Sequence, residues 1–299
     1  MMKAATEIKH LKAAGRRLPD YPFRWQGLED FAYQLDEQGV PRVNMGKRLG
    51  LRYNPITIAQ YGLFNLQQFS ATQNQSCLQR AHACAGWLID NFKEWRPGIG
   101  AWIYDYDLNF YGPAAPWISG MAQAQGISLL LRVHQVNATE RVPQITHQAF
   151  QAFLRPTAEG GVVSHFSDGS LIFEEFPTDP PSHVLNGHIF ALLGIHDYAA
   201  YWQKEAALEL FDVAVVGLER NLNLYDTGCW NLYDLHPSCR LASPMYVKVH
   251  VQLLRLLADL TSDVLFAETS EKWSAYLRDP ICRARWLFGK ILEKIRLRF

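Results

Sequence analysis

Two segments of this 299-residue chain concentrate side chains that can exchange protons or hold a polar ligand. In the first, Glu174 and Glu175 follow a short apolar run, and Asn186 comes after the next prolines. The second, residues 225–250, is dense in Tyr, Asp, His and Trp but poor in the Lys and Glu of an ordinary solvated loop. Its candidates are Tyr225, Tyr233, His236, Arg240, Tyr246 and His250. A polar, aromatic loop beside a carboxylate is typical of a sugar-binding cleft, and the alternatives are a solvated acidic turn and tyrosines that only pack helices.

The common cofactor and metal motifs are missing from the sequence. It contains no GxGxxG, GxxxxGK[ST], HExxH or GxSxG pattern, and no cysteine–histidine cluster with zinc-site spacing. We therefore expect no cofactor and no metal.

Composition narrows the class of protein further. Hydrophobic residues make up 48% and charged residues 19%, which excludes a disordered chain. The 29 basic and 29 acidic residues cancel, so no overall field would attract nucleic acid. Five cysteines without a CxxC pair, and the lack of a signal-peptide core, predict a reduced cytoplasmic protein.

Apolar spacing predicts a mostly helical fold. The helical runs cover 55–70, 77–94, 116–136, 140–154, 184–202, 204–221, 246–262 and 267–278. They form pairs, and the first members carry amides, histidines and small residues although their pattern is that of buried helices. We predict an incomplete α/α toroid built of helical hairpins, with a short β-hairpin near 159–175. A generic helical bundle is the alternative.

The ends of the chain differ from this body. Residues 1–50 mix prolines, aromatics and basic residues, and we expect an N-terminal arm packed on a toroid domain of residues 51–279. Residues 280–299 form a basic amphipathic helix rich in Trp, Phe and Leu. Such a helix predicts peripheral attachment to the inner face of a membrane. The alternatives are a helix that closes the toroid or one that packs on a second subunit in a homodimer.

Several motifs in one order resemble a known family. They are QYGL at 60–63, Trp117 with Gln123 and Gln125, the EEFPT segment at 174–178 with Val184–Gly187, YDTG at 225–228 and LYDL at 232–235. Together they are similar to the C-terminal catalytic region of D-glucuronyl C5-epimerase over residues 50–278. The resemblance implies a toroid and a cofactor-independent isomerase that converts D-glucuronic to L-iduronic residues in a heparosan-like polymer. It also implies that the β-rich domain of the animal enzymes is absent after QYGL.

The resemblance also implies roles for individual residues. Tyr246 and Glu175 would be the opposed acid–base pair, with Tyr233 assisting. Substrate would be held by His236, Arg240 and His250 at the carboxylate, and by Asn186, Trp117, Gln123 and Tyr225 elsewhere. Two positions depart from the family: Phe176 replaces a tyrosine, and His236 replaces an arginine. Glu174 should point away from Glu175, and its replacement by Gln should have little effect.

Two other functions share these residues. A uronate lyase would abstract the same proton and then eliminate the 4-linked sugar. A glycan-binding protein that has lost activity would explain Phe176 and His236.

Overall fold

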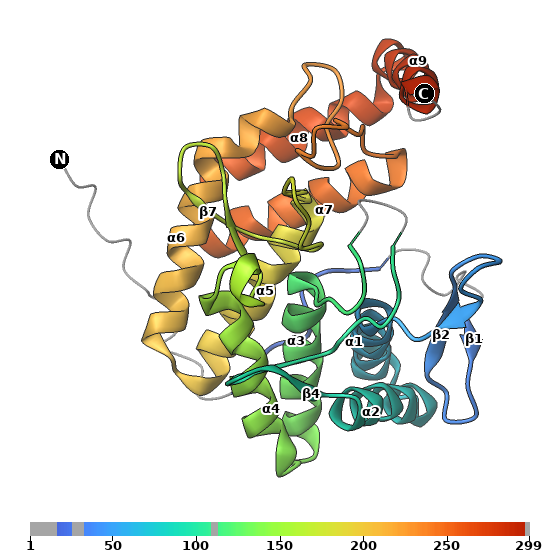
Figure 1. Ribbon diagram of the computed structural model, residues 1–299, viewed down its shortest axis with the longest axis vertical. Helices are drawn as coiled ribbons and strands as arrows, with labels where there is room; N and C mark the ends of the chain where they lie inside the picture. The colour runs from blue at the N-terminus through green and yellow to red at the C-terminus, as the bar shows by residue number, and fades with distance from the viewer. Residues whose placement is uncertain (1–16, 26–32, 109–112, 297–299) are drawn as a thin grey trace.

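The computed structural model describes residues 17–25, 33–108 and 113–296 and consists mainly of helices in antiparallel pairs (Figure 1). The pairs are α1 (Pro55–Thr72) with α2 (Gln75–Asp90), α3 (Gly120–Val136) with α4 (Arg141–Phe150), α5 (Leu185–Trp202) with α6 (Glu205–Asn221), and α7 (Pro244–Thr261) with α8 (Val264–Arg278); α9 (Pro280–Arg296) follows. Only Gln73 and Asn74 separate α1 from α2, so no domain is inserted there.

The first helix of each pair lies in an inner row. α3 packs between α1 and α5, and α5 in turn contacts α7, while each second helix covers its partner from outside. Within the described residues, α1 and α7 make no comparable contact, so the ring stays open. The predicted incomplete α/α toroid is confirmed.

Short antiparallel strands occupy the connections. They are β1 (Gln34–Leu35), β2 (Pro41–Asn44) and β3 (Leu51–Arg52) in one sheet, and the hairpins β4 (Lys93–Arg96) with β5 (Ile99–Ala101) and β6 (Val163–His165) with β7 (Leu171–Phe173). The last pair confirms the hairpin predicted near 159–175, with Val163 opposite Phe173.

Capping residues set where the inner helices begin. The side chains of Asn54, Ser119 and Ser243 accept hydrogen bonds from the first turns of α1, α3 and α7. The predicted start at residue 116 was therefore early, because Trp117 instead pairs with Tyr104 in a β-bridge. The prediction of 77–94 was also too long, since Lys93–Arg96 forms β4.

Glycine explains why the inner helices approach so closely. A Cβ atom at Gly194 of α5 would lie 2.5 Å from the Cα atom of Ala124 of α3, and one at Gly126 would lie 2.4 Å from the Trp102 ring. Small residues on buried helices thus let backbones touch.

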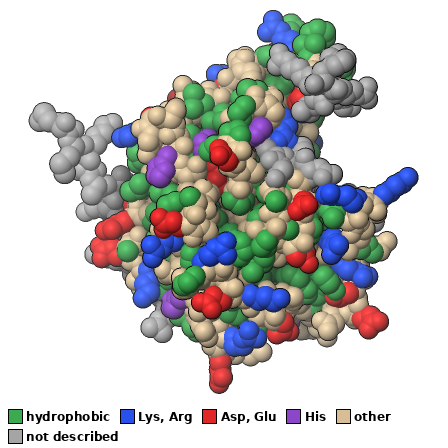
Figure 2. Space-filling model, in the orientation of Figure 1, with side chains coloured by type: hydrophobic (Ala, Val, Ile, Leu, Met, Phe, Trp, Pro, Cys, Tyr) green, Lys and Arg blue, Asp and Glu red, His purple; other side chains and the backbone are tan. Residues whose placement is uncertain are grey.

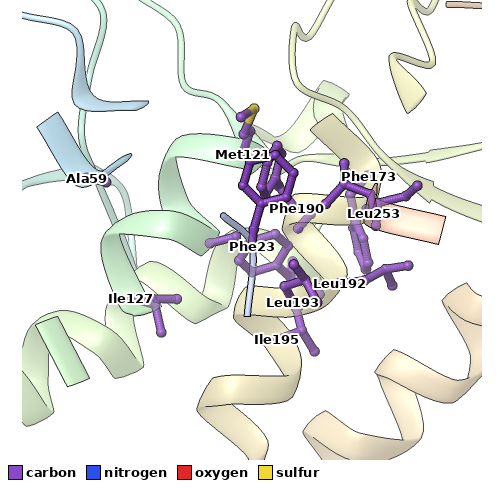
Figure 3. Close-up of a cluster of buried hydrophobic side chains, with 14 of the residues drawn as sticks. Phe23, Ala59, Met121, Ile127, Phe173, Phe190, Leu192, Leu193, Ile195 and Leu253 are labelled. Atoms are coloured by element: carbon purple, nitrogen blue, oxygen red, sulfur yellow. The ribbon is translucent and has the colours of Figure 1, made fainter. Parts of the chain in front are cut away.

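The N-terminal segment 17–25 lies across the open ring and joins its members. Gln67 of α1 donates to the carbonyls of Tyr21 and Phe23 at 2.5 and 2.7 Å, and the amide of Gln252 of α7 pairs with the backbone of Arg24. Figure 3 shows Phe23 beside Phe190, among the apolar side chains of α3 and α5. The segment supplies part of the core between helices that do not touch each other.

Replacing Gly194 by Ala should destabilise the toroid. The added methyl meets the α3 backbone, which cannot turn aside, so we expect the free energy of unfolding to fall by about 1–3 kcal/mol. Gly86, on α2, has open space around its Cα, and Gly86→Ala should instead raise that free energy by about 0.5–1 kcal/mol. Urea unfolding of both variants measures the difference; equal effects would contradict the close approach of α3 and α5.

Candidate active site

Hydrogen bonds link the beginnings of the inner helices at one end of the toroid. The Tyr104 hydroxyl donates to Asn54 at the start of α1, and the amide of Gly120 at the start of α3 donates to the Glu174 carbonyl. The amide of Leu185, which begins α5, donates to the Tyr233 carbonyl at 3.1 Å. The two segments selected from the sequence therefore meet at this mouth.

Glu175 lies at the mouth with its carboxyl against the first turn of α5. A Cβ atom at Gly187 would be 2.5 Å from Cβ of Glu175 and 2.6 Å from its Oε2, so only glycine leaves room for this side chain. Glu175 is 6% exposed, and its Oε2 has no hydrogen-bond partner among the described residues. Burial raises the pKa of Glu175 to about 8, with a smaller contribution from the charge of Glu174. At neutral pH this carboxyl holds its proton in most molecules and is an unusually strong base when ionised.

Tyr233 and Tyr246 form an edge-to-face pair beside this carboxyl, with ring centroids 4.6 Å apart. Burial raises the pKa of the Tyr246 hydroxyl, the charge of Glu175 raises it further, and a hydrogen bond with Tyr233 opposes these effects. The charge of Glu175 therefore acts on Tyr246 although the two residues lie far apart in the sequence. Tyr246 is therefore a protonated donor at neutral pH.

His250 lies behind the two tyrosines rather than at the surface of the mouth. It is fully buried, its Nδ1 is 2.5 Å from the Asn231 amide nitrogen, and its ring stacks on that of Tyr233 at 6.4 Å. Burial lowers the pKa of His250 to about 3, so the ring is neutral. This differs from the expected role in holding a carboxylate, because the imidazole has neither charge nor access; it supports the tyrosines instead.

Arg240 and His236 sit in a tight loop between Tyr233 and α7. Asp234 is fully buried and lies 3.4 Å from the Arg240 Nε, and its carboxylate also accepts from the His236 backbone amide. The Tyr233 amide donates to the Arg240 carbonyl at 2.7 Å, which closes the loop. The loop thus fixes a cation next to Tyr233.

Glu174 points away from Glu175, as strand alternation predicts, but it is not at the surface. It is 1% exposed and accepts hydrogen bonds from the Ser182 hydroxyl at 2.8 Å and the His183 amide at 3.0 Å. Its Oε1 is 2.6 Å from the Nδ1 of His183. Glu174 thus holds the loop that leads to α5, and the small effect expected of Glu174→Gln stays a prediction about activity.

The other four predicted ligands are buried at or near the mouth. The Asn186 Oδ1 has no partner among the described residues, next to Gly187. Trp117 is 3% exposed and stacks on Tyr104, with 4.0 Å between the ring centroids. The Phe176 ring also packs on Trp117, with 5.8 Å between the centroids. The structure commits two side chains to internal bonds: the Tyr225 hydroxyl donates to the His183 carbonyl, and Gln123 bonds to the backbone of residues 100, 102 and 149. These two brace the site and do not line it.

A groove beside the mouth was missed from the sequence. Its volume is about 200 Å³, and Trp95, Arg96, Trp117 and Pro177 contribute to its walls. The Arg96 guanidinium lies 4.0 Å above the Trp95 ring, and that indole donates to the Gly160 carbonyl. Trp95 and Arg96 lie in β4, just after the end of the helix predicted over 77–94, and no sequence motif marked them as part of a site.

No group of three or more His, Cys, Asp or Glu side chains lies close enough to hold a metal ion within the described ranges.

The buried carboxyl of Glu175 predicts a pH-dependent stability difference. Between pH 4.5 and about 8 the folded state holds a proton that the unfolded state has lost, so the wild type loses stability as the pH rises through this window. Glu175→Gln removes that cost, and its free energy of unfolding should gain on the wild type by at least about 1 kcal/mol across the window. Urea unfolding at several pH values measures this. Glu271→Gln, an exposed control, should show no such trend.

The chain is similar in sequence to one known family. A family model described as the D-glucuronyl C5-epimerase C-terminus matches residues 97–275. D-glucuronyl C5-epimerase of Caenorhabditis elegans is 31% identical over 241 residues, which are 74% of this chain and 38% of the worm protein. An uncharacterized protein of Methanocaldococcus jannaschii is 23% identical over 245 residues, or 76% of this chain and 79% of that protein. The chain thus spans little more than a third of the length of the worm relative.

Among solved structures, unsaturated glucuronyl hydrolase from Bacillus sp. GL1 has a similar fold. Its TM-score is 0.50 at 17% identity, over 75% of this chain and 62% of the hydrolase, and this likeness supports the toroid alone. The family of the chain is identified by the sequence comparisons. Because its model covers more than half of the chain and the worm relative is 31% identical across most of it, the chain belongs to the D-glucuronyl C5-epimerase C-terminal family.

Proposed function

We propose that this protein is a cofactor-independent C5-epimerase of hexuronate residues in a polysaccharide, acting on D-glucuronic acid in a heparosan-like polymer. The observation that carries the proposal is the pairing of Glu175 and Tyr246. Glu175 is a buried carboxyl of raised pKa, Tyr246 is a half-buried tyrosine whose pKa its charge raises, and the two come from separate parts of an epimerase-family chain. An epimerisation needs two such groups, one for each face of the sugar.

The proton steps follow from the state of each group. Ionised Glu175 takes the proton from C5, and the electrons of the C–H bond move into the uronate carboxylate to form an enediolate. Tyr246 then donates its hydroxyl proton to C5 from the opposite face, and the enediolate returns to a carboxylate. The tyrosinate and the protonated Glu175 recover their starting states by exchange with solvent. No cofactor enters this balance.

The negative charge that develops on the enediolate must be stabilised near Glu175. The beginning of α5 lies beneath that carboxyl, and no side chain caps this helix. Its positive end favours negative charge at this point. Arg240, held by Asp234, adds a cation on the side of Tyr233. We assign these groups to the substrate carboxylate and the enediolate.

Phe176 and His236 bear on substrate choice. Phe176 packs on Trp117 and has no hydroxyl, so Tyr233 remains as the assisting donor to Tyr246. His236 is partly exposed beside Ser238, with its Nδ1 2.8 Å from that hydroxyl. Its ring and Arg96 in the neighbouring groove are candidates for a second acidic sugar of the polymer.

Tyr246→Phe should remove most exchange of the C5 hydrogen with heavy water. The variant loses one hydroxyl, and a general acid contributes about 10²–10⁴-fold to the rate. We would incubate heparosan with each protein in heavy water and follow deuterium at C5 together with the glucuronate-to-iduronate ratio. Tyr198→Phe, whose hydroxyl contacts His147 far along α5, is the matched control and should retain full activity.

The outcomes of this experiment distinguish the alternatives. Retention of more than half the rate in Tyr246→Phe would remove Tyr246 from the mechanism. A wild-type product that absorbs near-ultraviolet light would identify a lyase, and polymer binding without exchange would identify a glycan-binding protein.

Gly187→Ala should inactivate the enzyme through Glu175. The new methyl occupies the space of the Glu175 side chain and displaces the carboxyl, and a misplacement of about 1 Å can cost about 10²-fold. Circular dichroism should show an intact toroid, because alanine is tolerated in a helix. Exchange within threefold of the wild type would contradict the placement of Glu175 at the start of α5.

A further inference from the structure

Helix α9 attaches to the body through one narrow face. Its first turn is capped by Asp279, which accepts from the amides of Ile281 and Cys282. The Trp286 indole donates to the Ala242 carbonyl at 2.9 Å and stacks on Trp230 at 5.6 Å. A Cβ atom at Gly289 would lie 2.6 Å from the Leu241 side chain. Positions 282, 286, 289 and 293 therefore define the inner side of the helix.

The opposite face of α9 is apolar and exposed. Its large side chains are 42–66% exposed, and they are Ile281, Leu287, Phe288, Ile291 and Leu292. At about 100° per residue they occupy one continuous sector of about 140°. Figure 2 shows hydrophobic and basic side chains together at the top of the molecule, where Figure 1 places α9. A continuous sector of this kind differs from the single apolar side chains scattered on any surface.

Basic residues border this apolar sector on both edges. Arg283 and Lys290 follow one edge, and Arg285 follows the other. The only acidic residue of the helix, Glu293, lies on the inner side, where it accepts from the Leu241 amide and from Lys290 at 2.8 Å. The outward face is therefore apolar in the middle, positive at its borders and without negative charge.

We propose that this face of α9 binds an anionic lipid surface, with its apolar sector in the acyl boundary and its basic borders at the headgroup phosphates. The arrangement matches an interfacial helix. A second copy of the chain is a poorer occupant, because pairing two such faces brings basic borders together with no acid between them. None of the helices in the described part of the chain combines the length and hydropathy needed to cross a bilayer.

The attachment point of α9 is close in the chain to residues of the site. Leu241 and Ala242, which contact α9, lie directly between Arg240 and the capping residue Ser243 of α7. Lipid binding does not depend on the reaction at the mouth, so its failure and the failure of the proposed function are separate results.

Flotation of the full chain with vesicles tests the proposal. Wild-type protein should float with phosphatidylcholine–phosphatidylglycerol vesicles at low salt and be released as salt is added, and it should float weakly with pure phosphatidylcholine. Changing Leu287, Phe288 and Ile291 to Ser together should abolish flotation on both. Arg283→Gln with Arg285→Gln should weaken binding to the anionic vesicles by roughly thirty-fold.

Val213→Ser with Val216→Ser is the matched control, since both valines are exposed on α6, where the neighbouring charges are mixed rather than basic. This variant should float like the wild type. Circular dichroism and urea unfolding confirm that each variant is folded. The proposal would be overturned if the wild type stayed at the bottom of the gradient with both kinds of vesicle. It would also be overturned if the triple Ser variant floated as well as the wild type. If the wild type were a dimer that did not float, and the triple Ser variant were a monomer, the face would be assigned to a second copy of the chain instead.

Discussion

The burial of one carboxyl, that of Glu175 against Gly187, is the constraint on which the rest of the site depends. A charged carboxylate loses its hydration there, and its pKa rises to about 8 because the described chain offers its Oε2 no hydrogen bond in return. This carboxyl lies at the start of α5, where the helix dipole favours its ionised form. The ionised form is the one that can act as a base. Burial raises the pKa of Tyr246, and the charge of Glu175, when that carboxyl is ionised, raises it further. The buried carboxyl of Glu175 therefore influences the protonation of both Glu175 and Tyr246.

Such a group stays in place only if its surroundings are rigid. Two buried acids brace the loops on either side of it: Glu174 binds Ser182 and His183, and Asp234 binds Arg240. A third, Asp226, accepts from Trp273 and Tyr276 and so fastens the 225–243 loop to α8. Each of these carboxylates has hydrogen-bond or ion-pair partners, whereas the Oε2 of Glu175 has none among the described residues. This difference distinguishes the three bracing residues from the residue that we propose reacts.

The toroid makes this mouth possible because its inner helices start at the same end. Their close packing, seen where Gly194 of α5 meets Ala124 of α3, leaves the polar loops to form the mouth. The ring is open between α1 and α7, and the segment that carries Tyr21 and Phe23 bonds to helices on both sides of the opening. Helix α9 is fastened through the Ala242 carbonyl to the loop that also carries Arg240, and its apolar face points away from that contact.

The sequence by itself determined the helical pairs, the hairpin and the family, because apolar period, prolines and capping residues are local signals and the motifs occur in a fixed order. It also singled out Glu175, Tyr233 and Tyr246. Only the tertiary structure decided which candidates reach the mouth, because burial depends on residues distant in the chain. His250 and Gln123 looked like ligands but lie behind the site or bond to backbone, and Glu174 proved to be a buried brace. The space for Glu175 exists because residue 187 is glycine, and no local pattern connects those two positions.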